Sequence, residues 1–252
     1  MSGTANRARR VGPRELSVRV TPRYRLMWGL NRMVVRSLFR LRVDGADHLP
    51  PAPYQLVCNH HNGFDPLIMI AAIPLEPRIT WFGPKERDFS RGFKNRVMTF
   101  FGGVIPYDPD KTTLMSAVRA VRRVFAADGV LGIFAEGRAG LDETSLLPFE
   151  DGAAAFAAAS GVPIVPCAII GSTRLWVGRT IIIRFGAPID SAAGRSREGR
   201  AQLERDIHAG VAALLPDREP RAGRIRPFES LLTDLLNGPE VAAERRGTRR
   251  HG

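Results

Sequence analysis

The sequence predicts an α/β fold: a mixed β-sheet flanked by helices, with an amphipathic helix at the N-terminal end. Two observations support this prediction. Short apolar runs typical of buried strands alternate with segments of helical period along the 252 residues. Several of these runs end in polar residues with glycine or proline, and such strand ends are where α/β proteins place their chemistry. The chain is long enough for one large domain with a substantial core.

The first 42 residues form two basic segments. Residues 1–22 are rich in Arg, Gly and Ser with little periodicity, so we expect a flexible basic arm. Residues 23–42 combine an arginine face with an apolar face, the pattern of an amphipathic helix. The arginine face holds Arg25, Arg32, Arg36 and Arg40, and the apolar face Met27, Leu30, Val34, Leu38 and Leu41. Because six arginines exclude a simple transmembrane span, we expect this helix to lie in the membrane interface. A helix packed on the domain, with its arginines in water, is the alternative.

The net charge of +12 is concentrated at the N-terminus. Residues 1–42 carry a net charge of +10, residues 43–190 carry −1 and residues 191–252 carry +3. Nucleic-acid-binding domains usually carry their basic residues on the folded face that reads the ligand, so nucleic acid is not expected as a partner. The distribution fits an anionic membrane surface better. Since no secretory signal is visible, we expect a peripheral protein on the cytoplasmic side of the cell membrane.

The remaining elements follow in order from residue 43. Strands are expected at 54–58, 78–82, 104–105, 130–134, 164–170 and 180–185, where apolar runs are bounded by turn residues. Helices are expected at 66–72, 90–101, 111–127, 149–160 and 197–215, with a further short one at 231–236. The uncharged stretch at 152–173 is not a membrane span, because Gly161, Pro163 and Pro166 divide it into a helix and a strand. Residues 216–252 are predicted to form a Pro/Gly/Arg-rich extension with a frayed end.

The strand at 54–58 leads into a loop that carries candidate catalytic residues. His60 and Asp65 are five positions apart, and one turning loop can bring the carboxylate back onto the imidazole. A histidine accepts a proton near neutral pH, and a carboxylate on its second nitrogen fixes the tautomer. From the local pattern alone, a histidine that caps a turn and an aspartate that caps the following helix are the alternative.

Four blocks of this sequence resemble those of the glycerolipid acyltransferases, the family of the bacterial 1-acyl-glycerol-3-phosphate acyltransferases. Asn59-His60-x-x-x-x-Asp65 is similar to the family's NHxxxxD signature. Three more blocks follow in the family's order, at Phe101–Pro106, Phe134–Arg138 and Val162–Pro166. The resemblance covers roughly residues 43–189 and implies a glycerol-3-phosphate acyltransferase-like fold, with the acyltransferase domain at 43–215.

The resemblance also implies a reaction. A fatty acyl group would pass from an acyl thioester, either acyl-CoA or acyl-carrier protein, to a hydroxyl of a lysophospholipid such as 1-acyl-glycerol-3-phosphate, in phospholipid biosynthesis. His60 would act as general base and Asp65 would orient it. The implied substrate-binding residues are Asn59, Lys85, Lys111, Glu136, Gly137 and Arg138. Among them, Arg138 is the candidate anion clamp and Glu136 a candidate loop organiser. Because a thiolate leaves readily, no enzyme nucleophile, cofactor or metal is expected.

The chain departs from the family in two blocks. The third block has EGR where the family has EGTR, a variation that some family branches share. After the second block the family commonly has an arginine that would hold the acceptor's phosphate, but this chain has Tyr107-Asp108-Pro109-Asp110-Lys111. Lys111 reaches further but offers a point charge in place of a planar fork. Another lipid acceptor, such as a glycolipid or an aminoacyl lipid, is therefore the second hypothesis.

Three further classes of function are weighed against acyl transfer. A metal-dependent hydrolase would use His60, His61 and Asp65, but the other three of the five histidines lie outside any ligand-spaced cluster. A thiol enzyme would use Cys58 as nucleophile, yet Cys58 and Cys167 both sit in apolar runs typical of buried free thiols. A non-catalytic lipid-binding protein with the same fold is the third.

Overall fold

A seven-stranded sheet organises the protein. The computed structural model describes residues 19–84, 103–107, 114–150, 152–220 and 226–237. The strands are β1 (Arg40–Asp44), β2 (Tyr54–Cys58), β3 (Ile79–Pro84), β4 (Val104–Tyr107), β5 (Val130–Phe134), β6 (Ile164–Ile170) and β7 (Thr180–Phe185). Their order across the sheet is β1-β7-β6-β2-β5-β3-β4, and all neighbours are parallel except β6 and β7. The predicted mixed sheet is confirmed.

Strand β2 lies in the middle of this sheet. It pairs in parallel with β5 on one side and with β6 on the other. Every residue of β2 and β6 is buried, as expected for parallel strands that are covered on both faces. These strands are continuous apolar runs for that reason. The loop after β2 therefore begins at the centre of one edge of the sheet.

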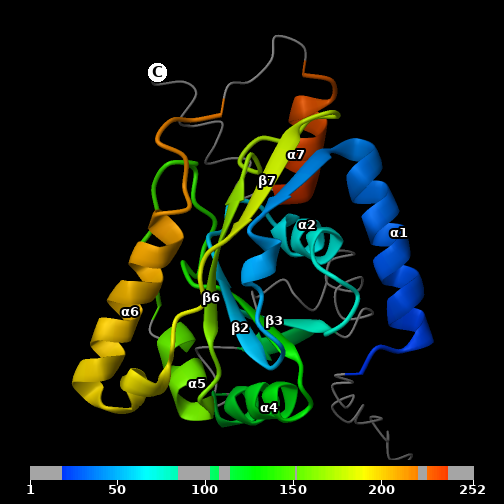
Figure 1. The fold of residues 1–252 in the computed structure, drawn as a ribbon. Helices are drawn as coiled ribbons and strands as arrows, with labels where there is room; N and C mark the ends of the chain where they lie inside the picture. Colours follow the sequence, from blue (N-terminus) through cyan, green and yellow to red (C-terminus); the bar gives the residue numbers. More distant parts are fainter. Residues whose placement is uncertain (1–18, 85–102, 108–113, 151, 221–225, 238–252) are drawn as a thin grey trace, which may run out of the picture.

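Helices cover both faces of the sheet (Figure 1). Helices α1 (Pro22–Leu38) and α2 (Asp65–Ala72) pack over a core cluster on one face. Helices α4 (Leu114–Ala126), α5 (Gly152–Ser160) and α6 (Arg197–Ala212) pack over a second cluster on the other face. Two short 3₁₀ helices, η1 (Ala46–His48) and η2 (Ala192–Arg195), and the C-terminal α7 (Glu229–Asn237) complete the described elements. The helix predicted at 90–101 lies outside the described residues.

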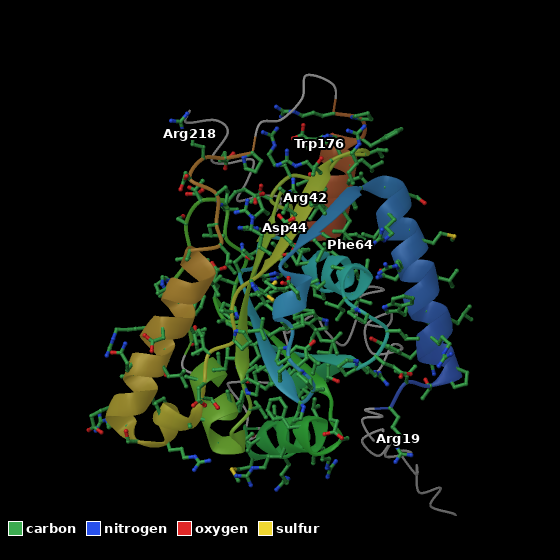
Figure 2. The ribbon with its side chains drawn as sticks, viewed as in Figure 1. Arg19, Arg42, Asp44, Phe64, Trp176 and Arg218 are labelled. Carbon is green, nitrogen blue, oxygen red and sulfur yellow. The ribbon has the colours of Figure 1, made fainter. Side chains whose placement is uncertain are left out.

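Helix α1 ends four residues earlier than the sequence predicted. Its first turn is capped by Thr21, whose hydroxyl accepts a hydrogen bond from Tyr24 N at 3.1 Å. The prediction of a helix to residue 42 was wrong, because Phe39 is extended and Arg40–Asp44 pairs with β7 instead. The alternation of polar and apolar residues in Arg-Leu-Arg-Val fits a strand as well as a helix, and only the distant β7 decides between them. Figure 2 shows Arg42 and Asp44 of this edge strand, which form an ion pair at 2.9 Å.

Helix α1 packs on the domain through its polar side chains. Asn31 Nδ2 donates to Leu67 O at 2.9 Å, and Arg32 Nη1 donates to Ala71 O at 2.7 Å, so both hold the helix to α2. The outward face of α1 exposes four apolar side chains: Leu26, Leu30, Met33 and Val34. None of the helices that the structure describes combines the length and apolar character needed to cross a membrane.

The C-terminal region docks onto the loop after β6. Leu175 N donates to Thr233 Oγ1 of α7 at 3.0 Å, and Arg174 forms an ion pair with Glu229. The predicted helix at 231–236 is confirmed, and it extends from Glu229 to Asn237. This part of the extension is packed, because Thr233 is buried against the loop. The end that was predicted to fray lies outside the described residues.

Candidate active site

The loop between β2 and α2 brings His60 and Asp65 together. Asp65 is the first residue of α2, and its Oδ2 lies 2.9 Å from His60 Nδ1. The same oxygen accepts hydrogen bonds from His61 N at 2.7 Å and Asn62 N at 2.8 Å. Asp65 is fully buried, whereas the His60 side chain is 21% exposed. No described residue hydrogen-bonds to His60 Nε2, so an Nδ1–H tautomer leaves the lone pair of Nε2 available.

The carboxylate of Asp65 is held in its charged form. Burial alone would raise the pKa of Asp65, but the hydrogen bond and charge of His60 outweigh it. The charge of His61 and its backbone N–H act in the same direction, and the pKa of Asp65 falls below its ordinary value. Asp65 is therefore an acceptor that keeps the proton of His60 on Nδ1.

A stack of two aromatic rings packs against the imidazole of His60. Phe134, at the end of β5, stacks on His60 with ring centroids 4.4 Å apart and an interplanar angle of 26°. Trp81 of β3 stacks on Phe134 at 4.6 Å and 4°. Gly132 makes room for the indole, because a Cβ at this position would lie 2.5 Å from two ring atoms of Trp81. The ring of His60 is thus placed by neighbouring strands as well as by its own loop.

Glu136 joins the third sequence block to the first. His60 N donates to Glu136 Oε1 at 2.8 Å, and Leu147 N donates to Oε2 at 2.9 Å. Gly140 N donates a hydrogen bond to His60 O at 2.7 Å. Because both carboxylate oxygens of the buried Glu136 hold backbone N–H groups, this residue fixes the position of His60 and of the loop that follows β5.

Asn59 directly follows β2, and its side chain contacts β6. Its Nδ2 donates to Ile169 O at 3.0 Å, and its Oδ1 accepts from Ile169 N at 2.7 Å. The side chain is fully buried between β2 and β6. Both ends of its amide thus join the ends of two strands, and substrate binding by Asn59 stays a prediction.

A buried hydrogen-bond network around Glu143 lies next to the loop that carries His60 and His61. Its carboxylate accepts hydrogen bonds from Gly171 N at 2.6 Å, from Thr173 N at 2.9 Å and from the hydroxyl of Thr173. His61 Nδ1 lies 3.9 Å from Glu143 Oε2, and His61 Nε2 lies 3.0 Å from Asp142 O. The rings of His60 and His61 thus contact different residues.

The other predicted residues of the third block lie on the surface. Gly137 has a φ of +66°, and a Cβ there would lie 3.2 Å from Glu150 Cγ, so the turn favours glycine. Arg138 is exposed and forms no ion pair with any other described residue. Lys85 and Lys111 lie outside the described residues.

A comparison with known proteins follows from this geometry. A family model described as Acyltransferase matches residues 40–170, just over half of the chain. The chain belongs to the acyltransferase family. This finding confirms the family that the four blocks predicted.

Individual proteins similar to this acyltransferase carry related names. The 1-acyl-sn-glycerol-3-phosphate acyltransferase alpha of Mus musculus is 27% identical over 216 residues, which cover 79% of this chain and 67% of the mouse protein. The enzyme of the same name from Homo sapiens is 31% identical over 145 residues, 52% of this chain and 47% of the human protein. The chain thus spans about half the length of the human relative.

A solved structure has a similar fold. The crystal structure of the 1-acyl-sn-glycerophosphate (LPA) acyltransferase, PlsC, from Thermotoga maritima matches with a TM-score of 0.59 and 15% sequence identity. The match covers 76% of this chain and 79% of that chain. The predicted fold is confirmed by this likeness.

Sequence reasoning missed several residues of the acyltransferase site. The stacked rings of Phe134 and Trp81 lie in apolar runs that predicted only strands, and no local signal pairs them with His60. Glu143 is one of several acids in a loop, and its partners lie 28 and 30 positions away. Cys58, by contrast, is fully buried, and burial and the neighbouring Cys167 thiol raise its pKa well above the ordinary value. A raised pKa disfavours the thiolate that a thiol enzyme needs.

Proposed function

We propose that this protein transfers a fatty acyl group from an acyl thioester, acyl-CoA or acyl-carrier protein, to a hydroxyl of a lysophospholipid. The first candidate acceptor is 1-acyl-glycerol-3-phosphate, which the names of the relatives favour. The observation that carries the proposal is the His60–Asp65 pair, with a contact of 2.9 Å at the end of the central strand. The pair combines a buried, charged carboxylate with a partly exposed imidazole, as a general base requires.

The proposed reaction uses His60 twice. Nε2 takes the proton of the acceptor hydroxyl as its oxygen attacks the thioester carbonyl carbon. The carbon–sulfur bond then breaks, and the proton passes from the imidazolium to the thiolate that leaves, so that the products are an ester and a thiol. Asp65 accepts the hydrogen bond of Nδ1 throughout and stabilises the imidazolium while it exists. The thiolate is a good leaving group, so this route needs neither an enzyme nucleophile nor a metal.

Basic residues near the site would bind the anionic parts of the substrates. Arg138 lies next to Gly137 in the block whose Glu136 holds His60, and it is exposed without an ion pair among the described residues. Its planar guanidinium can hold a phosphate with two parallel hydrogen bonds. Lys85 and Lys111 remain candidates for the same task from the sequence alone.

The membrane would supply the acceptor. Four exposed apolar side chains of α1, Leu26, Leu30, Met33 and Val34, are flanked by the exposed Arg25 and Arg36. This is the composition of a helix that lies in the interface of an anionic membrane. We place the protein on the cytoplasmic side as a peripheral enzyme of phospholipid biosynthesis.

The experiment that tests the proposal measures thiol release from acyl-CoA with lysophosphatidate as acceptor. We expect His60→Ala to reduce the rate by a factor on the order of 10²–10⁴, the contribution of a general base. The matched control is His48→Ala, an exposed histidine of η1. An unchanged rate in His60→Ala would remove the assignment of the base, and no turnover in the wild type would favour a lipid-binding protein.

A second acceptor class follows from the sequence after the second block. Asp108 and Asp110 stand where an acceptor-binding arginine is common in the family, which favours a less anionic lipid. The same assay with a lysoglycolipid and a hydroxylated aminoacyl lipid tests this alternative. If either gives a higher kcat/KM than lysophosphatidate, the acceptor in the first proposal is wrong while acyl transfer stands.

A further inference from the structure

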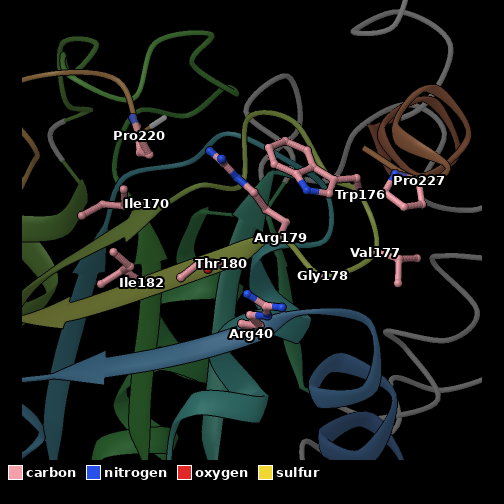
Figure 3. Close-up of a pocket in the computed structure, with 10 residues that line it drawn as sticks. All are labelled: Arg40, Ile170, Trp176, Val177, Gly178, Arg179, Thr180, Ile182, Pro220 and Pro227. Carbon is pink, nitrogen blue, oxygen red and sulfur yellow. The ribbon is translucent and has the colours of Figure 1, made fainter. Parts of the chain in front are cut away.

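A cleft lies on the sheet away from the acyl-transfer site. Its volume is about 440 Å³, and its lining includes Arg40, Trp176, Gly178, Arg179 and Pro227 (Figure 3). Arg40 begins β1, and Arg179 directly precedes β7, so both arginines lie at the end of the sheet where β6 ends. This is also the end from which the His60 loop leaves β2, because β2 and β6 are parallel.

The cleft and His60 lie on opposite faces of the sheet. The cleft is lined by Ile170 and Ile182, whose chain neighbours Ile169, Ile181 and Ile183 belong to the core cluster under α1 and α2. Successive strand residues point to opposite faces, so the cleft faces away from that cluster. Phe134, which stacks on His60, packs against the cluster. The cleft is therefore separate from the proposed acyl-transfer site.

Arg179 is a buried cation with unused hydrogen-bond donors. Only 6% of the residue is exposed, and its guanidinium lies 4.3 Å from the centroid of the Trp176 ring. Its Nε donates to Gly171 O at 3.1 Å, but no acceptor among the described residues takes a hydrogen bond from Nη1 or Nη2. A buried charge of this kind is costly unless a counter-ion meets it. Glu143 and Glu219 act on Arg179 only through space, without an ion pair among the described contacts.

The other arginines around the cleft divide into two groups. Arg174 and Arg226 both form ion pairs with Glu229 of α7. Arg40 is exposed, and its side chain makes no ion pair with a described residue. Among the described residues that line the cleft, Arg40 and Arg179 are thus the guanidinium groups available to an external anion. Guanidinium groups match the geometry of phosphate oxygens.

Apolar side chains beside the cleft indicate where such a phosphate would come from. Val177 N donates to Pro227 O at 3.1 Å and Gly178 N donates to Leu38 O at 2.7 Å, so the rim of the cleft holds the end of α1 and the approach to α7. Figure 2 shows Trp176 at this end of the molecule, near α7. Phe228 directly follows Pro227, and Leu231 lies three residues further along the chain. The two side chains are 65% and 59% exposed. Phe228 also has a φ of 58°, a conformation that non-glycine residues adopt at a cost.

We propose that the cleft between Arg40 and Arg179 binds the phosphate of an anionic phospholipid, with Phe228 and Leu231 in the acyl boundary beside it. The cleft would give the protein a second contact with the membrane besides the outward face of α1. Basic side chains at the headgroup level next to exposed apolar ones are the arrangement of interfacial binding. This inference rests on the proposed membrane association, and not on acyl transfer itself.

The test is sedimentation of the full-length protein with vesicles of phosphatidylcholine, with and without phosphatidylglycerol. We expect Arg40→Gln to weaken binding to the anionic vesicles about fivefold, the effect of one basic residue near the lipid, and to leave binding to neutral vesicles unchanged. Arg179→Lys keeps the charge but removes the fork, and should weaken the same binding. The matched control is Arg200→Gln, an exposed arginine on α6 that does not line the cleft.

The outcomes separate the alternatives. Wild-type binding by both Arg40→Gln and Arg179→Lys, or an equal loss in Arg200→Gln, would overturn the proposal, because general charge attraction would then suffice. A soluble anion as the true ligand would appear as thermal stabilisation of the wild type, but not of Arg40→Gln, by inorganic phosphate without vesicles, and it too would overturn the lipid assignment. Thiol release in detergent micelles should be unchanged in Arg40→Gln. A wild type that binds vesicles but releases no thiol contradicts the proposed function alone.

Discussion

Three described residues hold His60, two of them through its ring and one through its backbone. Asp65 fixes Nδ1 at 2.9 Å, Phe134 covers one face at 4.4 Å, and Glu136 holds the backbone N–H at 2.8 Å. If His60 is the base that we propose, it needs little rearrangement when the proton moves, which is how positioning lowers a barrier. The His60 side chain is 21% exposed, so in the proposed reaction an acceptor hydroxyl could reach it.

Arg138 allows a prediction about substrate binding at this same scale. If its guanidinium holds the phosphate of the acceptor in the ground state as well as in the transition state, Arg138→Ala should raise KM for lysophosphatidate and leave kcat nearly unchanged. The loss should be on the order of tenfold or more, as expected for a charge-assisted hydrogen bond. Steady-state thiol release with varied acceptor measures both constants. Arg122→Ala, at an exposed arginine of α4, is the control. A fall in kcat alone would contradict the anion-clamp role.

At the scale of elements, the strands show how far sequence reasoning reaches. β5, β6 and β7 have the predicted bounds because each contains a run of at least three apolar residues and has glycine, proline or polar residues near its ends. β1 was missed because the pattern of Arg40–Asp44 fits a helix as well as a strand, and its pairing with Thr180–Arg184 spans 140 positions. The His60–Asp65 contact was predictable because both residues belong to one loop. The Glu143 network and the aromatic stack were not, because they depend on which strands become neighbours.

The approach of Trp81 to Gly132 gives a prediction for the packing of β3 on β5. A Cβ at Gly132 would lie 2.5 Å from the indole, so Gly132→Ala must displace Trp81 and, through it, Phe134 and His60. We expect a loss of about 1–3 kcal/mol in the free energy of unfolding, the cost of overpacking, together with a lower kcat. Urea unfolding and thiol release measure the two effects.

Gly83 of β3 provides the control for this substitution. Nothing lies within 4 Å of a Cβ built at Gly83, so Gly83→Ala should change stability by no more than about 1 kcal/mol and leave the stack in place. If Gly132→Ala proves as stable and active as Gly83→Ala, the indole does not support the imidazole in the way described.

At the scale of the whole molecule, the two sides of the sheet carry different helices and different surface features. One side carries α1 and α2, while the other carries α4, α5 and α6 (Figure 1). The His60 loop and the apolar outward face of α1 belong to the first side, and the cleft at Arg179 belongs to the second. The end of α1 and the approach to α7 meet at the turn of residues 176–178. If both α1 and the cleft contact lipid, the His60 loop would be held near the membrane surface from which the acceptor comes.

Asp65 links the site to the stability of the whole fold. Its pKa is lower in the folded protein than the ordinary value of 3.8, so the folded state favours the deprotonated carboxylate. The stabilisation is therefore complete above pH values near 4, and it is lost as the pH falls through the folded-state pKa. Asp65→Asn removes it at every pH. We expect the difference in unfolding free energy between wild type and Asp65→Asn to shrink as the pH is lowered from 7 to about 3.

Urea unfolding at a series of pH values measures this difference directly. Asp217→Asn, the same change at an exposed carboxylate, should shift the unfolding free energy by less than about 0.5 kcal/mol. A difference for Asp65→Asn that stays constant down to pH 3 would contradict the lowered pKa of Asp65 in the folded protein.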